Sequence, residues 1–155
     1  IPIYKFSIYK KAKDMVDSGM FGNLMQVQVD FGLAPLFWAH PHSVDLILFF
    51  AGDRELQTVQ ASLSNIEINP ANGDIESDPV VEQAGMLFND GLVGTISKIG
   101  GMNVILGCER GSITVRADGI GIFITLIKIH RLFYGLIIRN ICSMDGSSTN
   151  VHRRI

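Results

Sequence analysis

The densest group of side chains capable of acid–base chemistry in this sequence runs from Trp38 to Asp45, Trp-Ala-His-Pro-His-Ser-Val-Asp. On a helix, His42 and Asp45 are three positions apart and share a face. A histidine beside a carboxylate can serve as a general acid or base near neutral pH. The plainer interpretation is that Asp45 caps the helix and His42 is buried with its hydrogen bonds satisfied, and the residues alone favour it.

A metal site is a further interpretation of the same segment, because the spacing of His40, His42 and Asp45 suits one superficially. Pro41 is typical of the first turn of a helix, which would leave His40 ahead of that helix and pointing elsewhere. We therefore expect no metal ion here. No serine or cysteine has the local signature of an activated nucleophile.

A nicotinamide-binding loop needs the pattern G-x-G-x-x-G between a strand and a helix, so that backbone can approach the pyrophosphate. The nearest candidate is Gly119-Ile120-Gly121, but its third position is Ile124. No Walker-type phosphate loop and no G-x-S-x-G motif is present. We expect no dinucleotide-binding (Rossmann) domain in this chain and no cofactor bound by this chain alone.

Composition sets the class of protein. The 155 residues are 47% hydrophobic and 18% charged, which predicts one domain over 1–155 with a sizeable core. A formal net charge of −2 argues against a nucleic-acid partner. The apolar run 119–127 is too short for a membrane span. Cys108 and Cys142 form no disulfide pattern, and the first residues resemble no signal peptide, so we expect a cytoplasmic protein.

Hydrophobic periodicity predicts the elements that position the histidines. It indicates a helix over 7–18 and a half-buried strand over 24–31. Residues 42–51 could form a strand, but Asp45 favours a short helix, because negative charge is stabilised in a helix's first turn. Ser7 is the expected N-cap of the first helix and Gly19 the glycine that follows it.

The rest of the chain predicts strands and turns. Strands are expected over 56–68, 80–88, 92–99, 102–107, 112–117 and 120–129, and helices over 132–142 and 147–155. The acidic residues in and around the loop 69–79, Asp78 among them, are expected to form a solvated edge. Glycine-containing turns of two or three residues separate the middle strands and imply antiparallel pairing. The fold class is therefore α+β, a predominantly antiparallel open sheet with helices on one face.

Several segments taken together resemble the C-terminal domain of the glucose–fructose oxidoreductase/inositol dehydrogenase (Gfo/Idh/MocA) family. They are Ser18-Gly-Met-Phe-Gly-Asn-Leu-Met-Gln-Val27, His42-Ser-Val-Asp-Leu-Ile47 with Ala51-Gly52, Phe88-Asn-Asp-Gly-Leu-Val-Gly-Thr-Ile96, Gly107-Cys-Glu-Arg-Gly-Ser-Ile113 and Asp145 to Arg153. Each motif alone is weak, but their order along most of the chain is fairly specific to the family.

The resemblance implies the substrate-binding and oligomerisation half of an oxidoreductase that uses NAD or NADP on a sugar, an inositol or a related polyol. His42 matches the family's catalytic histidine, and Trp38, His40 and Asp45 would line the substrate site. The cofactor and the family's catalytic lysine would belong to another half, so this chain alone would be inactive. An open sheet face that is apolar needs cover, which predicts a homodimer through that face.

The sequence also departs from the family pattern. Trp38 stands four residues before His42, where the family often has an aspartate, and Ala34-Pro35-Leu36-Phe37 replaces its usual glycine pair. A histidine without that acidic partner also suits a non-catalytic domain of the same fold that binds a sugar or a protein, or acts as a scaffold. That function is the alternative.

Overall fold

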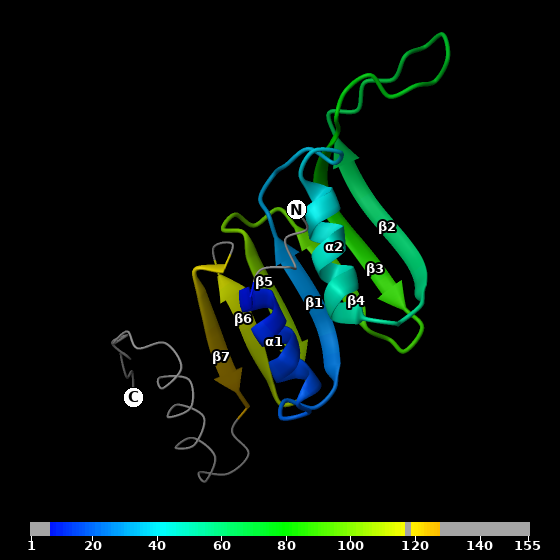
Figure 1. Cartoon of the computed structure of the whole chain (residues 1–155). Helices are drawn as coiled ribbons and strands as arrows, with labels where there is room; N and C mark the ends of the chain where they lie inside the picture. The colour runs from blue at the N-terminus through cyan, green and yellow to red at the C-terminus, as the bar shows by residue number, and fades with distance from the viewer. Residues whose placement is uncertain (1–6, 117–118, 128–155) are drawn as a thin grey trace.

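The computed structural model describes residues 7–116 and 119–127. The described elements are α1 (Ser7–Asp17), β1 (Leu24–Asp30), α2 (His40–Ala51), β2 (Leu56–Ser64), β3 (Val80–Phe88), β4 (Val93–Ser97), β5 (Asn103–Cys108), β6 (Gly111–Arg116) and β7 (Gly121–Leu126). The strands form one open sheet in the order β2-β3-β4-β1-β5-β6-β7, and both helices lie against one of its faces (Figure 1). Only the β1–β4 pairing is parallel, so the predicted α+β, mostly antiparallel sheet is confirmed. The helices expected over 132–142 and 147–155 fall outside the described residues.

Helix α1 covers the β6–β7 side of the sheet. It buries Tyr9, Ala12 and Val16 while its lysines face outward. Ser7 is already a helical residue and not the cap that the sequence predicted. Gly19 has a φ of +72°, and its N–H donates to the Val16 carbonyl, as expected for a glycine after a helix end.

Helix α2 lies across β1 and β4 at the centre of the sheet. Its underside buries Leu46, Ile47, Phe50 and Ala51. Gly94 of β4 lies directly beneath, and a Cβ added to it would stand 2.5 Å from Cγ2 of Ile47. The absence of a side chain at this glycine therefore sets how closely the helix approaches the sheet.

Strand β1 differs from its predicted alternation at its start. Strict alternation over the predicted strand would place Met25 on the same face as Val27 and Leu24 on the other, but Leu24 is buried and Met25 is 52% exposed. The pairing with β5 shifts register between Leu24 and Gln26, which indicates a bulge at Met25. One extra residue reverses the faces upstream of it, and simple alternation does not reveal such a residue.

The predicted strand 56–68 is too long, because β2 ends at Ser64 and Asn65 takes a φ of +56°. Residues 65–79 then form an arm that projects from the end of the sheet beyond β2 and β3 (Figure 1). A bridge between Ile68 and Ile75 joins its two sides. We call this segment the arm.

The two faces of the sheet differ in chemistry. Valine, leucine, isoleucine and phenylalanine side chains on the helix side form the core. The open face carries mostly uncharged polar side chains, by strand register Gln26, Gln28, Thr58, Gln60, Ser62, Gln83, Thr95, Ser97, Ser112, Thr114 and Thr125. The open face is therefore not the apolar surface from which we predicted dimerisation; only scattered side chains such as Leu87, Val93 and Phe123 are apolar there.

Gly94→Ala tests the close contact between α2 and β4. The added methyl meets Ile47, so we expect the free energy of unfolding to fall by about 1–3 kcal/mol, the usual cost of overpacking. The matched control is Gly85→Ala on β3, where a Cβ meets nothing within 4 Å. Urea denaturation measures the free energy of unfolding of both variants. Equal stability of the two would show that α2 does not pack closely against Gly94.

Candidate functional site

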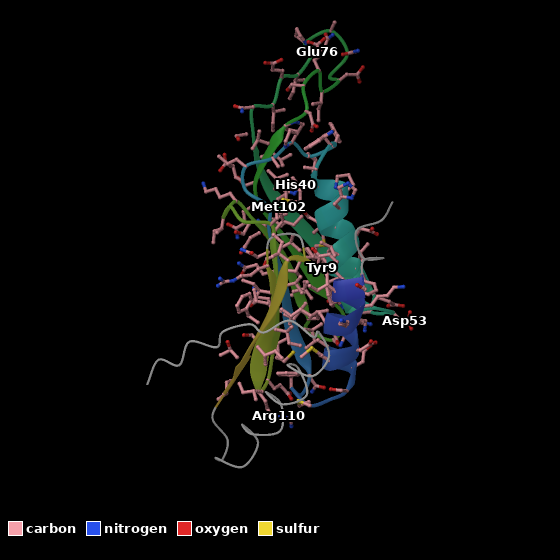
Figure 2. All side chains as sticks on the ribbon, turned by 60° about the vertical axis from the view of Figure 1, so that its left-hand side comes forward. Tyr9, His40, Asp53, Glu76, Met102 and Arg110 are labelled. Carbon is pink, nitrogen blue, oxygen red and sulfur yellow. The ribbon has the colours of Figure 1, made fainter. Side chains whose placement is uncertain are left out.

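The candidate site lies at the N-terminal end of α2. Residues 31–39 lead from the end of β1 into this helix. Figure 2 shows His40 at the end of α2 nearest to the arm that carries Glu76, with Asp53 beyond the opposite end. The four residues predicted for the site thus lie close together: Trp38 is on the turn before α2, and His40, His42 and Asp45 are in the first half of the helix.

His42 is exposed and Asp45 is half-buried. The helix begins at His40 after Ala39, which makes no side-chain capping bond, so Asp45 lies beyond the first turn and caps nothing. Among the described residues no hydrogen bond or ion pair joins the side chains of His42 and Asp45. The plainer interpretation of these two residues, a cap and a satisfied buried histidine, is therefore wrong.

His40 is placed differently from the prediction. It lies in the first turn of α2 and not ahead of it, and its side chain is 1% exposed. Its Nδ1 is 3.2 Å from Oγ of Ser43, and its ring meets the ring of Phe31 edge-on at 5.7 Å. Its Nε2 has no hydrogen-bond partner in the described part of the chain. The imidazole thus lies beneath the site surface and does not form part of it.

Burial lowers the pKa of His40 below its ordinary value, because a buried ring loses the solvation of its charged form. The Ala34 backbone and the Asp78 carboxylate act in the opposite direction and are outweighed. His40 is therefore neutral at neutral pH, and the imidazole exposed at the surface here is that of His42.

Two aromatic side chains are displayed beside this histidine. Trp38 is 79% exposed and Phe37 is 61% exposed. Their backbone is fixed although their rings are free: the N–H of Phe37 donates to Oδ1 of Asp78 at 2.7 Å and the N–H of Trp38 donates to Oδ2 at 3.1 Å. The Leu36 N–H also donates to the Pro79 carbonyl, at 2.8 Å. The base of the arm thereby holds the turn that precedes α2.

Asp78 is the site residue that the sequence did not reveal. It was predicted to lie on a solvated acidic edge, yet it satisfies two backbone donors about 40 positions away in the chain. Nothing local marks this role, because an aspartate before a proline in a loop is ordinary turn chemistry.

Taken together, the surface offers an exposed imidazole, a carboxylate one helical turn further on and two aromatic rings on a rigid turn. An imidazole so placed can take a proton from a ligand hydroxyl, and an aromatic ring can pack against the apolar face of a sugar. Among the described residues no group of three or more histidine, cysteine, aspartate or glutamate side chains is arranged to hold a metal ion. No helix in the same part of the chain has the length and apolar character to cross a membrane.

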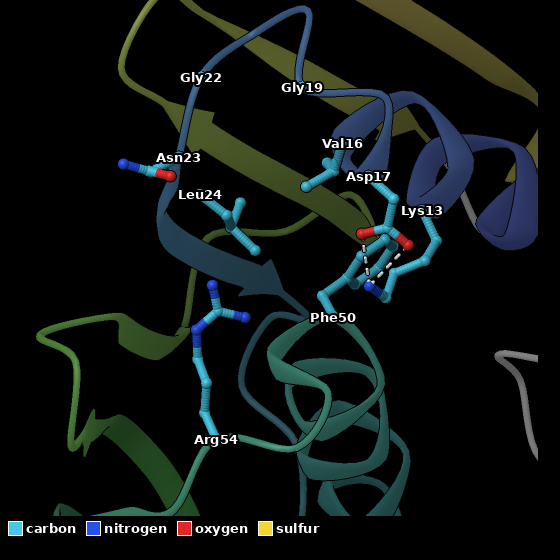
Figure 3. A pocket seen from close by; sticks show the side chains of 9 residues that line it. All are labelled: Lys13, Val16, Asp17, Gly19, Gly22, Asn23, Leu24, Phe50 and Arg54. Atoms are coloured by element: carbon cyan, nitrogen blue, oxygen red, sulfur yellow. Dashed lines mark hydrogen bonds and ion pairs between the residues drawn. The ribbon is translucent and has the colours of Figure 1, made fainter.

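A cavity of about 300 Å³ lies elsewhere, at the C-terminal end of α2 (Figure 3). Its lining residues are Lys13, Val16, Asp17, Gly19, Gly22, Asn23, Leu24, Phe50 and Arg54. Lys13 is paired with Asp17 at 2.7 Å, and Arg54 with Asp90 at 2.6 Å. The cations of this cavity are thus already neutralised, and the candidate site shares no residue with it.

The sequence and the fold can each be compared with those of known proteins. No family model and no curated protein matches the sequence. Solved structures do match. A WlbA dehydrogenase from Bordetella pertussis, in complex with NADH and UDP-GlcNAcA, is 18% identical with a TM-score of 0.58; the match covers 90% of this chain and 50% of that one. The fold is that of the C-terminal region of Gfo/Idh/MocA-type oxidoreductases.

Two further structures agree. An aldose–aldose oxidoreductase from Caulobacter crescentus, complexed with glycerol, is 12% identical with a TM-score of 0.60, over 79% of this chain and 42% of that one. A 3-ketoreductase from Actinomadura kijaniata, in complex with TDP-benzene and NADP, is 12% identical with a TM-score of 0.58, over 82% and 43%. This chain spans half or less of the length of these three proteins. At such identities the likeness establishes the fold, and the predicted resemblance is confirmed at that level.

Asp78→Ala tests the anchoring of the turn that carries Phe37 and Trp38, which we call the aromatic turn. Loss of two charge-assisted bonds frees the backbone of Phe37 and Trp38 and should cost about 1 kcal/mol of stability, as for a lost helix cap. Trp38 is the only tryptophan of the chain, so the steady-state fluorescence anisotropy of the chain reports its motion directly. We expect the anisotropy to fall in Asp78→Ala and to stay unchanged in Asp74→Ala, which alters an arm residue that bonds only within its own turn. Equal anisotropy in both variants would contradict the role of Asp78.

The lowered pKa of His40 predicts a pH-dependent stability. At pH values below about 6.5 the unfolded chain binds a proton that the folded ring resists, so the free energy of unfolding falls as the pH drops through about 6.5. His40→Asn, which keeps a polar partner for Ser43, should flatten this slope. Glu82, Asp90 and Glu109 have pKa values lowered chiefly by hydrogen bonds, so their contributions are lost only at more acidic pH. Urea denaturation at a series of pH values measures the slope, and a slope identical in the variant would assign it to other groups.

Proposed function

We propose that this chain is the substrate-side domain of an NAD(P)-dependent oxidoreductase that acts on a sugar, an inositol or a related polyol. The observation that carries the proposal is the exposed imidazole of His42 at the start of α2, on a fold shared with dehydrogenases. Among them, the Bordetella protein was solved with NADH and UDP-GlcNAcA. Membership of the Gfo/Idh/MocA family, as distinct from its fold, belongs to the proposal.

The described residues do not fit a nicotinamide nucleotide. The chain has no glycine-rich phosphate loop opening a helix, and the cavity at the other end of α2 has its cations already paired. The cofactor would be held by residues outside this chain, and its nicotinamide would supply the hydride acceptor or donor. This chain would supply the group that accepts and returns the hydroxyl proton, and it should be inactive alone.

In the proposed mechanism a substrate hydroxyl donates a hydrogen bond to a ring nitrogen of His42. As the carbinol carbon is oxidised, the ring nitrogen accepts the hydroxyl proton and an imidazolium ion forms. In the reverse direction the ring returns that proton to the carbonyl oxygen. General acid–base catalysis of this kind contributes about 10² to 10⁴ in rate.

The neighbouring residues bind and orient the substrate. Trp38 would pack its ring against the apolar face of the sugar, and the half-buried carboxylate of Asp45 would accept a hydrogen bond from a hydroxyl. His40 would act from beneath the surface, because its buried ring supports the first turn of α2 through Ser43 and Phe31. Asp78 is a positioning residue, since it fixes the turn that carries Trp38.

The non-catalytic function remains a second candidate on one observation. His42 has no carboxylate partner among the described residues, and Trp38 stands where the family often has an aspartate. A protein that only binds a sugar or a protein partner needs the aromatic turn but not the proton transfer. The two functions differ in which residue matters: turnover requires His42, and binding alone requires Trp38.

Two further assignments go with the proposal. Association of two copies through the open sheet faces would bring together uncharged threonine, serine and glutamine side chains, which can hydrogen-bond across an interface.

A cytoplasmic location agrees with the free, buried Cys108 and with the lack of a disulfide pattern in the sequence.

His42→Asn tests the proposal in the complete polypeptide that joins this chain to a nucleotide-binding half. We expect kcat to fall by about 10² to 10⁴ because the proton acceptor is lost, while substrate binding changes little. Trp38→Ala should instead raise KM, because it removes a binding surface.

The control is the isolated chain titrated with NADH, which should leave the nicotinamide fluorescence unchanged. Undiminished turnover in His42→Asn would rule out the proton shuttle. A protein with no turnover at all, whose sugar binding depends on Trp38 alone, would favour the non-catalytic function.

A further inference from the structure

Strand β2 forms one edge of the sheet that the described residues build. It lies at the end of the strand order, and within residues 7–116 and 119–127 the strand it pairs with is β3 alone. No backbone group of residues 58–64 bonds to any other described segment. Every residue from Leu56 to Ser62 is exposed, including Val59 at 56%. Of the two described helices, α2 lies on β1 and β4 and α1 on β6 and β7, so neither covers this strand (Figure 1).

This edge lacks the features by which proteins prevent strands from pairing. Natural edge strands are short, are interrupted by a bulge, or carry lysine or proline. The sequence of β2, Leu-Gln-Thr-Val-Gln-Ala-Ser-Leu-Ser, has no charged residue and no proline over nine positions. The one register shift that adds a residue to β2 lies near its start, between Leu56 and Thr58. A second shift, between Ser62 and Leu63, places its extra residue in β3 and not in β2. Residues 58–64 therefore run without an inserted residue and present a row of backbone donors and acceptors that have no partner among the described residues.

A second copy of the same strand fits this row. An antiparallel pair related by a two-fold axis perpendicular to the sheet is self-complementary. With the axis at Ala61, the middle of residues 58–64, Val59 stands opposite Leu63 of the second copy on the helix side. Thr58 stands opposite Ser64, and Gln60 opposite Ser62, on the open side. Apolar residues meet apolar ones and polar residues meet polar ones, and no like charges meet.

We infer that β2 is a self-association edge, at which two copies of the chain pair antiparallel about Ala61 and join their two sheets into one. This contact is independent of the proposed oxidoreductase function. It is also distinct from association through the open faces, because it uses backbone groups at the edge and leaves the face free. If both contacts form, two orthogonal interfaces build a tetramer.

Cysteine cross-linking tests the contact and its register in the full chain. In Ala61→Cys the two thiols face each other across the axis, where paired Cα atoms are about 4.5–5.5 Å apart, within reach of a disulfide. In Val59→Cys the two thiols are offset by four residues, roughly 14 Å apart, which is out of reach. We expect mild oxidation to give a covalent dimer with Ala61→Cys and not with Val59→Cys. The chain with only its native cysteines is the background control.

A charge test distinguishes the edge from the face. Ala61→Lys places two ammonium groups opposite each other and should halve the mass of the assembly measured by light scattering. Thr95→Lys, a change in the middle of the open face, should leave edge pairing intact. A monomeric wild-type chain, equal cross-linking of the two cysteine variants, or an assembly sensitive to Thr95→Lys and insensitive to Ala61→Lys would each overturn the inference. A monomer would mean that the edge has no partner. Equal cross-linking would mean that the strands pair in a different register. Sensitivity to Thr95→Lys alone would mean that the copies associate through the open face and not through the edge.

Discussion

The packing of α2 on the centre of the sheet is the contact on which the rest of the structure depends. The helix lies on β1 and β4, the two strands that pair in parallel, and Gly94 leaves the space that Ile47 fills. The free energy of this contact comes from burying an almost entirely apolar underside. Helix α2 makes no capping bond through a side chain at its start, whereas at its other end the Arg54 guanidinium donates to the Ala51 carbonyl.

Because the sheet holds α2 in place, the turn before it can expose its side chains while its backbone stays ordered. The chain is fixed on both sides of Trp38: by the Asp78 carboxylate at the backbone of Phe37 and Trp38, and by the buried ring of His40 against Ser43 and Phe31. The aromatic rings and the imidazole of His42 then face outward without a loss of order in the backbone. A ligand that meets such a surface pays little entropy to order it, which is the physical advantage of a preorganised site.

Much of the fold follows from local chemistry in the sequence. Short turns with glycine join β3 to β4 and β5 to β6, so these two antiparallel hairpins were predictable from residues a few positions apart. The turn at Gly100 and Gly101 does not form the hairpin that its glycines suggest, because β1 lies between β4 and β5. The errors arise where distant contacts decide. The bulge at Met25 depends on pairing with β5, the start of α2 at His40 depends on burial of that ring, and the role of Asp78 depends on a turn 40 positions upstream. The polar character of the open face was readable residue by residue, but only the strand register shows that these side chains share one face.

The central claim is that the N-terminal end of α2 is the ligand-binding surface. Nuclear magnetic resonance of the ¹⁵N-labelled chain tests it most directly, because the single tryptophan gives one indole N–H signal at the site. The chain is titrated with sugar nucleotides, inositols and simple polyols. We expect a compound that binds to shift the Trp38 indole signal together with backbone signals of residues 37–45. Shifts confined to the cavity around Lys13 and Arg54, or no shift with any of these compounds, would contradict it.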